Sequence, residues 1–556
     1  MNANEQVYVF KPHERPTLPG SPANPDHPAS RRRAYLAIGA LIGITGGLGN
    51  ALVAVNLNFA QGTLGLYTNE SAWLTAAYLM TNVPANLLLV KYRQQFGLRS
   101  FIAIALLGYA LSTLLHLFVH GFWTSVLVRA VNGLAASGLT TLTVLYLLQG
   151  MSPAKRLFGG MIGICIPQLA TPLARALSPR LLDGGDWHML YWFELGLALL
   201  TLGAVWSLPL PPSNREKVFE RLDFLTCALL MPALWLLIAV LSEGRIEWWT
   251  ERSWIGYALI ASIALIGAAL IIEHLRANPL IDTRWLGTRE VVRLMLVAAS
   301  VRILLSEQAF GSVGLLSVAG MLNDQMITLN LIIIAASLAG LATAVLTFRP
   351  ADLATPINIA MTMIAVGAFM DSFSNSLTRP SSFYLSQAII GFASLLFLAQ
   401  ATVIGFARAL LTGGKQFISF IVLFSMSQSL GGLIGAALLG TFQTVREKIH
   451  SLELVQSIVA SDPLVAARLQ AGAAQLNGTL LDPTLRAATG AGTLAQQVAR
   501  EATILAFNDV FLLVGVLALL ALTWGLYIRW SIWRRGEVSA VVLLQKKLQE
   551  AAKAMT

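Results

Sequence analysis

Long apolar runs recur along almost the whole chain, and each is close to the length that crosses a lipid bilayer. A membrane helix needs roughly 20 apolar residues to cross a hydrocarbon core about 30 Å thick. Runs of this kind begin near Tyr35, Ala72, Ser100, Thr124, Leu157, Leu190, Leu222, Ser253, Val291, Met326, Thr355, Phe383, Phe417 and Thr503. Since unpaired backbone groups cannot face lipid, such runs fold as helices. The sequence therefore predicts an all-α integral membrane protein with about fourteen transmembrane helices.

Composition supports this prediction and removes several classes of function. Only 12% of the 556 residues are charged, whereas a soluble domain carries roughly 25%. The formal charge of +10 is spread over short loops rather than gathered on one soluble face, which argues against a nucleic-acid partner. Cys165 and Cys227 lie inside apolar runs without metal or disulfide spacing. With no nucleotide-binding motif and no recognisable set of catalytic residues, we expect no cofactor, no metal and no enzymatic activity.

The spacing of the runs divides the chain into two sets of six helices separated by two more. The expected order is a disordered cytoplasmic tail at 1–34, an N-terminal six-helix bundle at 35–208, a linker with two additional helices at 209–288, a C-terminal six-helix bundle at 289–528 and a cytoplasmic tail at 529–556. The second bundle includes a long periplasmic loop at 443–502, within which 464–476 is a candidate amphipathic helix. That helix would either bind a partner or cap the surface of the membrane-embedded body.

Lys and Arg residues set the expected orientation in the membrane, because they are enriched in cytoplasmic loops. One set of alternate loops holds many of them, including 31–33, 155–156 and 534–535. The short loops of the opposite set hold only Arg180, Arg245, Arg252 and Arg379. We therefore expect a multi-pass protein of the cell inner membrane with both termini in the cytoplasm.

Ionisable residues within membrane helices are rare here, and each is a candidate for function because its burial is costly. Desolvation favours the neutral form of a carboxyl group, so Glu307 could bind and release protons near neutral pH, and Glu194 is a second candidate. Arg302, close to the middle of its run, could bind an anionic substrate. The alternative for Glu307 and Arg302 is a structural ion pair with another helix. His116 and His120 are interpreted as interfacial.

Asparagines in the first two helices provide polar groups without charge. Asn50 lies in the first run, and Asn82 and Asn86 lie four residues apart in the second, so that their amides share a helix face. Such a face must point to another helix or to a cavity. Interhelical hydrogen bonding and lining of a substrate cavity therefore both remain open.

A set of short motifs resembles the fourteen-helix drug:proton antiporter branch (EmrB/QacA type) of the major facilitator superfamily. Arg129, Asn132 and Gly133 resemble its Arg-x-x-Gln-Gly pattern, and Thr171-Pro172 stands where the antiporter motif has Gly-Pro. The branch's Leu-Gly-Gly-x-x-Gly pattern is matched further on by Gly431, Gly432 and Gly435. The order of these motifs extends over nearly the whole chain.

The resemblance implies a major facilitator fold, with a substrate site between two pseudo-symmetric bundles and alternating access. It also implies export of drugs or other amphipathic compounds by proton antiport, with Arg129 in proton coupling. By the same analogy, partners would include a periplasmic adaptor protein and an outer-membrane channel. Two departures weaken the analogy: the acid of the branch's first helix is replaced at 48–54, and the Asp of its inner-loop motif is missing at 90–99. The alternatives are uniport or symport of an organic anion, and a membrane sensor that does not transport.

Overall fold

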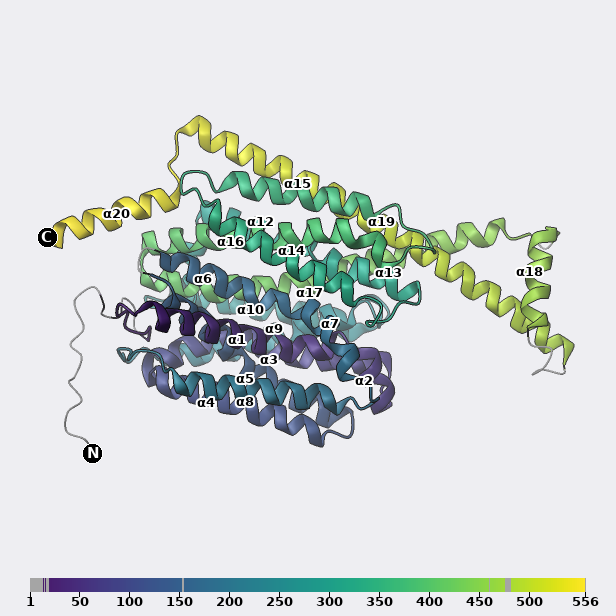
Figure 1. Cartoon of the computed structure of the whole chain (residues 1–556), viewed down its shortest axis with the longest axis horizontal. Coiled ribbons are helices and arrows are strands. Elements are labelled where there is room, and N and C mark those ends of the chain that lie inside the picture. Colours follow the sequence, from purple (N-terminus) through teal and green to yellow (C-terminus); the bar gives the residue numbers. More distant parts are fainter. Residues whose placement is uncertain are drawn as a thin grey trace.

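The architecture is a bundle of long, roughly parallel helices that crosses a membrane many times (Figure 1). The computed structural model describes residues 14, 16, 20–152, 155–459, 461–475 and 482–555. Within these residues, 14 helices are long and apolar enough to span a bilayer. The predicted all-α membrane architecture is therefore confirmed.

The first six spans form the N-terminal bundle, drawn in purple to blue in Figure 1. Their helices are α1 (Ala29–Ala54), α3 (Thr68–Phe96), α4 (Leu98–Leu115), α5 (Phe122–Gly150), α6 (Arg156–Cys165) with α7 (Ala170–Leu181), and α8 (His188–Ser207). A short helix α2 (Leu57–Leu64) joins α1 to α3, and 3₁₀ turns lie at His116–Phe118 and Ile166–Leu169. Pro167 at the start of the second turn lacks a backbone N–H, which favours the interruption between α6 and α7.

The remaining spans form the additional pair and the C-terminal bundle. Their helices are α9 (Arg221–Glu243), α10 (Ser253–Leu275), α12 (Arg289–Leu304) with α13 (Val313–Val318), α14 (Ile327–Leu346), α15 (Ala354–Asp371), α16 (Tyr384–Thr412), α17 (Gly414–Ser457) and α19 (Pro483–Arg535). Shorter elements are α11 (Thr283–Leu286), a 3₁₀ turn at Pro380–Phe383, α18 (Pro463–Ala474) and α20 (Ala540–Met555). A π-helical segment at Glu307–Ser312 interrupts the span formed by α12 and α13.

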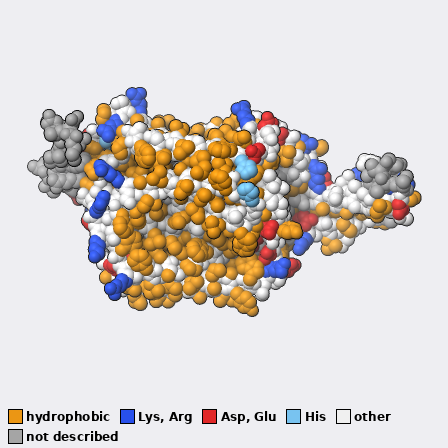
Figure 2. All heavy atoms as spheres, turned by 90° about the horizontal axis from the view of Figure 1, so that it is seen from below, with side chains coloured by type: hydrophobic (Ala, Val, Ile, Leu, Met, Phe, Trp, Pro, Cys, Tyr) orange, Lys and Arg blue, Asp and Glu red, His pale blue; other side chains and the backbone are white. Residues whose placement is uncertain are grey.

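The lateral surface of the body is apolar, as a lipid-facing surface must be. Figure 2 shows hydrophobic side chains covering the body and charged side chains gathered toward its ends. Large side chains such as Leu127 (65% exposed) and Ile263 (62% exposed) contribute to this surface. Only 17% of the most apolar stretch of α10 is buried inside the protein, so most of this helix faces outward.

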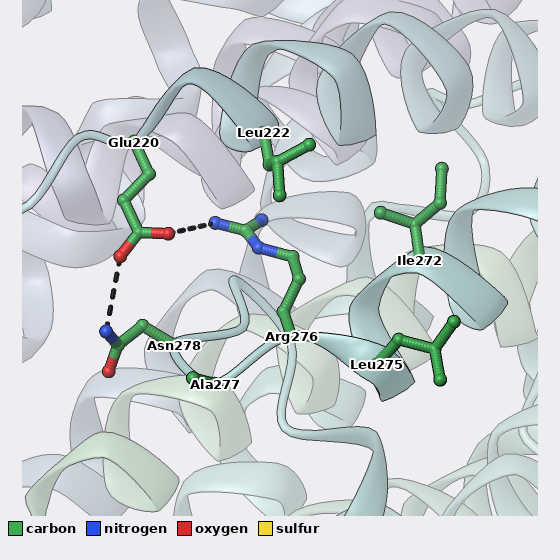
Figure 3. Close-up of a pocket in the computed structure, with 7 residues that line it drawn as sticks. All are labelled: Glu220, Leu222, Ile272, Leu275, Arg276, Ala277 and Asn278. Atoms are coloured by element: carbon green, nitrogen blue, oxygen red, sulfur yellow. Dashed lines mark hydrogen bonds and ion pairs between the residues drawn. The ribbon is translucent and has the colours of Figure 1, made fainter.

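The additional helices α9 and α10 are fixed to the N-terminal bundle by buried ion pairs. Asp223 of α9 accepts from Lys91 of α3 at 2.6 Å and from Arg276, which follows α10, at 2.8 Å. Arg276 also pairs with Glu273 at 2.7 Å and with Glu220 at 3.0 Å, the latter drawn in Figure 3. Lys91 belongs to the inner-loop segment that lacks the expected Asp, and here Asp223 supplies an acid from another helix.

The segment expected as a long loop at 443–502 is largely helical, which differs from the sequence interpretation. Helix α17 continues to Ser457, α19 begins at Pro483, and α18 packs against α19. Figure 1 shows these elements projecting beyond the body as a helical extension. We call the end of the body that carries it the hairpin end, and the opposite end, where α1 begins and α19 ends, the terminal end. Residues 460 and 476–481 of the expected loop lie outside the described residues.

The two ends of the chain also differ from the expected tails. Helix α1 begins at Ala29 rather than near residue 35, and Ala23 before it is buried, with its N–H bonded to the carbonyl of Pro212. Half of the expected disordered tail, at 1–13, 15 and 17–19, lies outside the described residues. At the other end, α19 runs to Arg535 and is followed by α20.

Candidate functional site

A buried polar cluster surrounds Arg129 in the N-terminal bundle. The guanidinium of Arg129 (1% exposed) donates to the carbonyl oxygens of Gly49 at 2.8 Å and Leu74 at 3.2 Å, and to Oδ1 of Asn50 at 2.7 Å. It also lies over the ring of Tyr78, 4.7 Å from the centroid. Asn50, predicted to bind substrate, therefore holds Arg129, and the cation joins α5 to α1 and α3.

Glu194 of α8 belongs to the same polar cluster. Its Oε1 accepts from the hydroxyls of Tyr109 at 2.8 Å and Thr113 at 3.3 Å. The side chain of Asn132 donates to the hydroxyls of Thr113 and Ser112, both at 3.2 Å. Arg129 and Glu194 form no ion pair within 4 Å among the described contacts, so Tyr109, Thr113 and Asn132 provide the polar surroundings of the acid. We call this set of residues around Arg129 and Glu194 the Arg129 cluster.

A second buried cluster in the C-terminal bundle contains two acids. The side-chain amide of Gln387, on α16, donates to Glu307 at 3.0 Å and to Asp371, the last residue of α15, at 2.7 Å. Glu307 is 0% and Asp371 2% exposed, and Oε2 of Glu307 has no hydrogen-bond partner among the described residues. No Lys, Arg or His among the described residues forms an ion pair with either acid. We call Glu307 and Asp371 the acid pair.

The local backbone at Glu307 is unusual for a membrane helix. Glu307 opens the π-helical segment, a form that is rare and frequent at functional sites. The adjacent Gln308 turns its amide to Gln387, donating to the side-chain oxygen at 3.2 Å and to the carbonyl at 3.3 Å. In the π-helical segment, the neighbouring side chains of Glu307 and Gln308 therefore both form hydrogen bonds with Gln387.

Arg302 lines a cavity of about 60 Å³ between the two bundles. The lining residues are Gln168 of the N-terminal bundle and Arg302, Leu305, Gln308, Ser394, Leu395, Phe397, Leu398 and Gln428 of the C-terminal bundle. Nε of Arg302 donates to the backbone carbonyl of Gln428 at 3.0 Å. A Cβ on Gly431 or Gly432 would meet the Arg302 side chain at about 3 Å, so the motif glycines provide room for it. The ion pair proposed as the alternative role for Arg302 is not present among the described contacts.

Contacts between the bundles lie toward both ends of this cavity. Toward the hairpin end, Asn323 accepts from Arg175 at 3.3 Å and donates to Asn56 at 3.2 Å. On the other side, Phe158 of α6 stacks edge-on against Phe348, with centroids 5.0 Å apart. Arg175 is thus placed at the bundle contact and not among the cavity-lining residues.

The other sequence candidates make helix-packing contacts. Asn82 donates to the carbonyl of Gly133 on α5 at 3.0 Å, and Asn86 donates to the carbonyl of Asn82 at 3.0 Å. These bonds correspond to the interhelical alternative for Asn82, and neither side chain lines the cavity of Arg302. His116 is 1% exposed and stacks on Tyr191, in contrast to the interfacial location expected for it.

The remaining motif residues also lie at helix contacts or near the helix interruption. A Cβ on Gly435 would meet the side chain of Ser306 at 2.3 Å, so α17 approaches α12 closely at this glycine. Pro172 lies in the first turn of α7, just after the 3₁₀ turn.

Sequence reasoning missed the partners of Glu307. No role is assigned to Asp371 or to Gln387 from the sequence. The available signal was that each is a polar residue inside or at the end of an apolar run. Their contact depends on how α12, α15 and α16 pack. Among the described residues, no group of three or more His, Cys, Asp or Glu side chains could hold a metal ion.

Two helical bundles facing each other across a central cavity are shared with solved transporters of the major facilitator superfamily. The human organic anion transporter MFSD10 aligns with a TM-score of 0.51 and 12% identity, over 89% of this chain and 100% of that one. A bacterial homologue of the human drug peptide transporters PepT1 and PepT2 aligns with a TM-score of 0.54 and 12% identity, over 90% and 99%. This likeness shows the fold. No family model matches the chain.

The chain therefore has the fold of the major facilitator superfamily, with 14 candidate spans among the described residues, and its relatives by sequence are distant. The multidrug export protein EmrB of Haemophilus influenzae is 23% identical over 498 residues, which cover 86% of this chain and 92% of the relative. EmrB of Escherichia coli K12 is 23% identical over 504 residues, with the same coverage. The efflux pump FUS6 of Gibberella moniliformis is 24% identical over 242 residues, 41% of each chain.

Proposed function

We propose that this transporter exports amphipathic small molecules by proton antiport, with alternating access at the cavity between the bundles. The observation that carries the proposal is the acid pair, in which Glu307 and Asp371 share the amide of Gln387. Two buried carboxylates so close together, with no cation beside them, cannot both be charged at low cost. A proton held between them and released when the site opens would provide the exchanged ion.

The direction of transport is supported by the distant relatives. EmrB of Haemophilus influenzae is a multidrug export protein that matches 86% of this chain, and FUS6 is an efflux pump that matches 41% of it. The first-helix acid of that branch is replaced here, so the proton must be carried elsewhere. The acid pair provides a location in the C-terminal bundle, and the Arg129 cluster, with Glu194, is a second polar site in the N-terminal bundle.

The proposal is tested by gradient-driven transport in inverted membrane vesicles. Energised vesicles containing the full chain are given lipophilic cations such as ethidium and aromatic acids such as naphthoate, and uptake is measured with and without a proton-gradient uncoupler. We expect uncoupler-sensitive uptake in the wild type and its loss in Glu307→Gln. Equal gradient dependence in both proteins would refute the proton role of Glu307.

A second candidate function is uniport or proton symport of an organic anion, favoured by Arg302, which has no acidic partner among the described contacts. The direction of the proton flow separates the candidates. A given pH gradient drives the substrate against the proton flow in an antiporter and with the proton flow in a symporter. A uniporter does not respond to the pH gradient when the membrane potential is clamped.

We also propose that the terminal end faces the cytoplasm, in a cell inner membrane. The distribution of Lys and Arg supports this orientation, including Arg93 and Arg99 near the end of α3 and the start of α4, and Arg534 and Arg535 at the end of α19. The helical extension would then lie in the periplasm and could contact an adaptor protein of an outer-membrane channel. Cysteines introduced at Ser461 and at Ser539 should react with a membrane-impermeant thiol reagent from opposite sides.

A further inference from the structure

The cavity between the bundles has a distinctive set of polar groups. Its nine lining residues include one arginine, three glutamines and one serine, and none is acidic. The rest of the lining is formed by Leu305, Leu395, Phe397 and Leu398, all from the C-terminal bundle. The cavity thus presents donors of hydrogen bonds beside an apolar wall.

Two of the donor side chains lack the partners that buried groups normally have. Arg302 forms no ion pair with any described acid, although the charged groups of the Lys91 and Arg276 network all do. The Nε2 atom of Gln428, a residue that is only 7% exposed, has no hydrogen-bond partner in the part of the chain that the structure describes. A buried donor left without an acceptor is costly, so an acceptor in the cavity would stabilise Gln428, and a negatively charged one would also give Arg302 an opposing charge.

The position of Arg302 is set by its surroundings and not by an opposing charge. The bond from Nε to the carbonyl of Gln428 and the close approach of Gly431 and Gly432 hold the stem of the side chain against α17. The two terminal nitrogens of a guanidinium remain available in a planar fork that matches a carboxylate. Gln428 therefore orients Arg302 through its backbone and offers its own amide to the same cavity.

The cavity is also connected to the acid pair. Gln308, one of the lining residues, donates to Gln387, and Gln387 donates to Glu307 and Asp371. A molecule in the cavity that contacts Gln308 would therefore be linked through Gln308 to Gln387, whose amide is shared by the acid pair.

We infer that this cavity binds the anionic head group of the transported molecule, a carboxylate attached to an apolar or aromatic body, with Arg302 and Gln428 as its donors. A carboxylate would then be the substrate class of the proposed exporter. Its transport rests on the proposed function, whereas its binding to Arg302 and Gln428 does not. A cavity of about 60 Å³ accommodates a carboxylate group, and the body of the substrate would extend along the apolar wall into space that opens when the bundles separate.

The inference is tested by equilibrium binding, without any gradient, to the full chain purified in detergent. The probes are naphthoate and naphthamide, which have nearly the same shape but differ in charge at neutral pH. We expect the wild type to bind naphthoate at least about tenfold more tightly than naphthamide, because a charged hydrogen bond in a buried site is stronger than a neutral one. Arg302→Gln should lose this preference mainly by weakening naphthoate binding.

Two further variants separate a binding role from a structural one. Arg175→Gln removes another buried arginine that lies outside the cavity, and it should keep the preference for naphthoate. Gln428→Glu places a negative charge beside Arg302 and should abolish the preference, which also decides the question if Arg302→Gln does not fold. Absence of saturable naphthoate binding, no preference in the wild type, or an unchanged preference in Gln428→Glu would overturn the inference.

The same measurement is independent of proton coupling. Glu307→Gln should keep the preference for naphthoate while it loses gradient-driven transport. If Glu307→Gln transports normally but Arg302→Gln and Gln428→Glu lose the preference, the antiport proposal fails and the anion site stands. If coupling is lost in Glu307→Gln but the wild type shows no preference for naphthoate, the anion site fails and the antiport proposal stands.

Discussion

The Arg129 cluster and the acid pair are both buried polar sites toward the hairpin end, but they differ in charge balance. The first contains one cation and one acid, and Arg129 is held by two carbonyls and an asparagine. The second contains two acids, one bridging amide and no cation among the described contacts. A balanced cluster can keep a fixed charge state and join helices, whereas an unbalanced one must exchange a proton when its surroundings change.

The largest expected effect compares the acids of the two clusters. Glu307→Gln should reduce gradient-driven transport by at least about tenfold, because a glutamine cannot carry the exchanged proton. Glu194→Gln should leave most of the gradient dependence in place. Both are measured in the inverted-vesicle assay at matched expression. Equal loss in the two variants would remove the distinction between the clusters.

Charge balance in the Arg129 cluster predicts the next largest effect. Arg129→Gln should lower the stability of the purified protein by about 3 to 5 kcal/mol, because it leaves Glu194 buried without a cation in its cluster. The double variant Arg129→Gln, Glu194→Gln should regain part of this loss. Thermal unfolding in detergent measures both. A double variant whose loss equals the sum of the two single losses would show that the charges are not coupled.

The asparagines of α3 should contribute much less than the charged groups. Asn82→Ala removes one bond to the carbonyl of Gly133 and should cost about 0.6 kcal/mol, the usual value for a hydrogen bond between membrane helices. Transport should remain near the wild-type level. A large loss of transport without loss of stability would instead indicate that Asn82 contacts the substrate.

The smallest expected effect concerns the ion network at the terminal end, where charges are paired outside the membrane core. The hydrogen bond from Arg276 holds the pKa of Glu220 below its ordinary value of 4.5. Ionised Glu220 therefore stabilises the fold at neutral pH. This contribution is lost as the pH falls through the lowered pKa of Glu220 and the carboxylate is protonated. The difference in unfolding temperature between wild type and Glu220→Gln should be small at pH 7 and should vanish near pH 3. A difference that grows in acid would contradict the role of the pair.

Much of the fold could be predicted from the sequence, because the length of each apolar run is set by the bilayer and not by tertiary contacts. Glu307 and Arg302 could also be selected, since a charge inside an apolar run stands out by itself. Asp371 and Gln387 could not be assigned to Glu307, because they are 64 and 80 residues away and their contact depends on the packing of three helices. The helical extension was interpreted as a long loop with one candidate amphipathic helix at 464–476, because its Ala- and Gln-rich segments are not apolar enough to span a membrane.

The unbroken course of α19 has a mechanical consequence. The helix runs for 53 residues from the tip of the extension to the terminal end. Its part before residue 503 is roughly 30 Å long at 1.5 Å per residue. A rigid lever of that length would displace its tip by about 5 Å for each tilt of about 10° of the membrane-embedded part. Spin or fluorescent labels near Arg486 and on the body would therefore register each switch of access as an amplified change in distance.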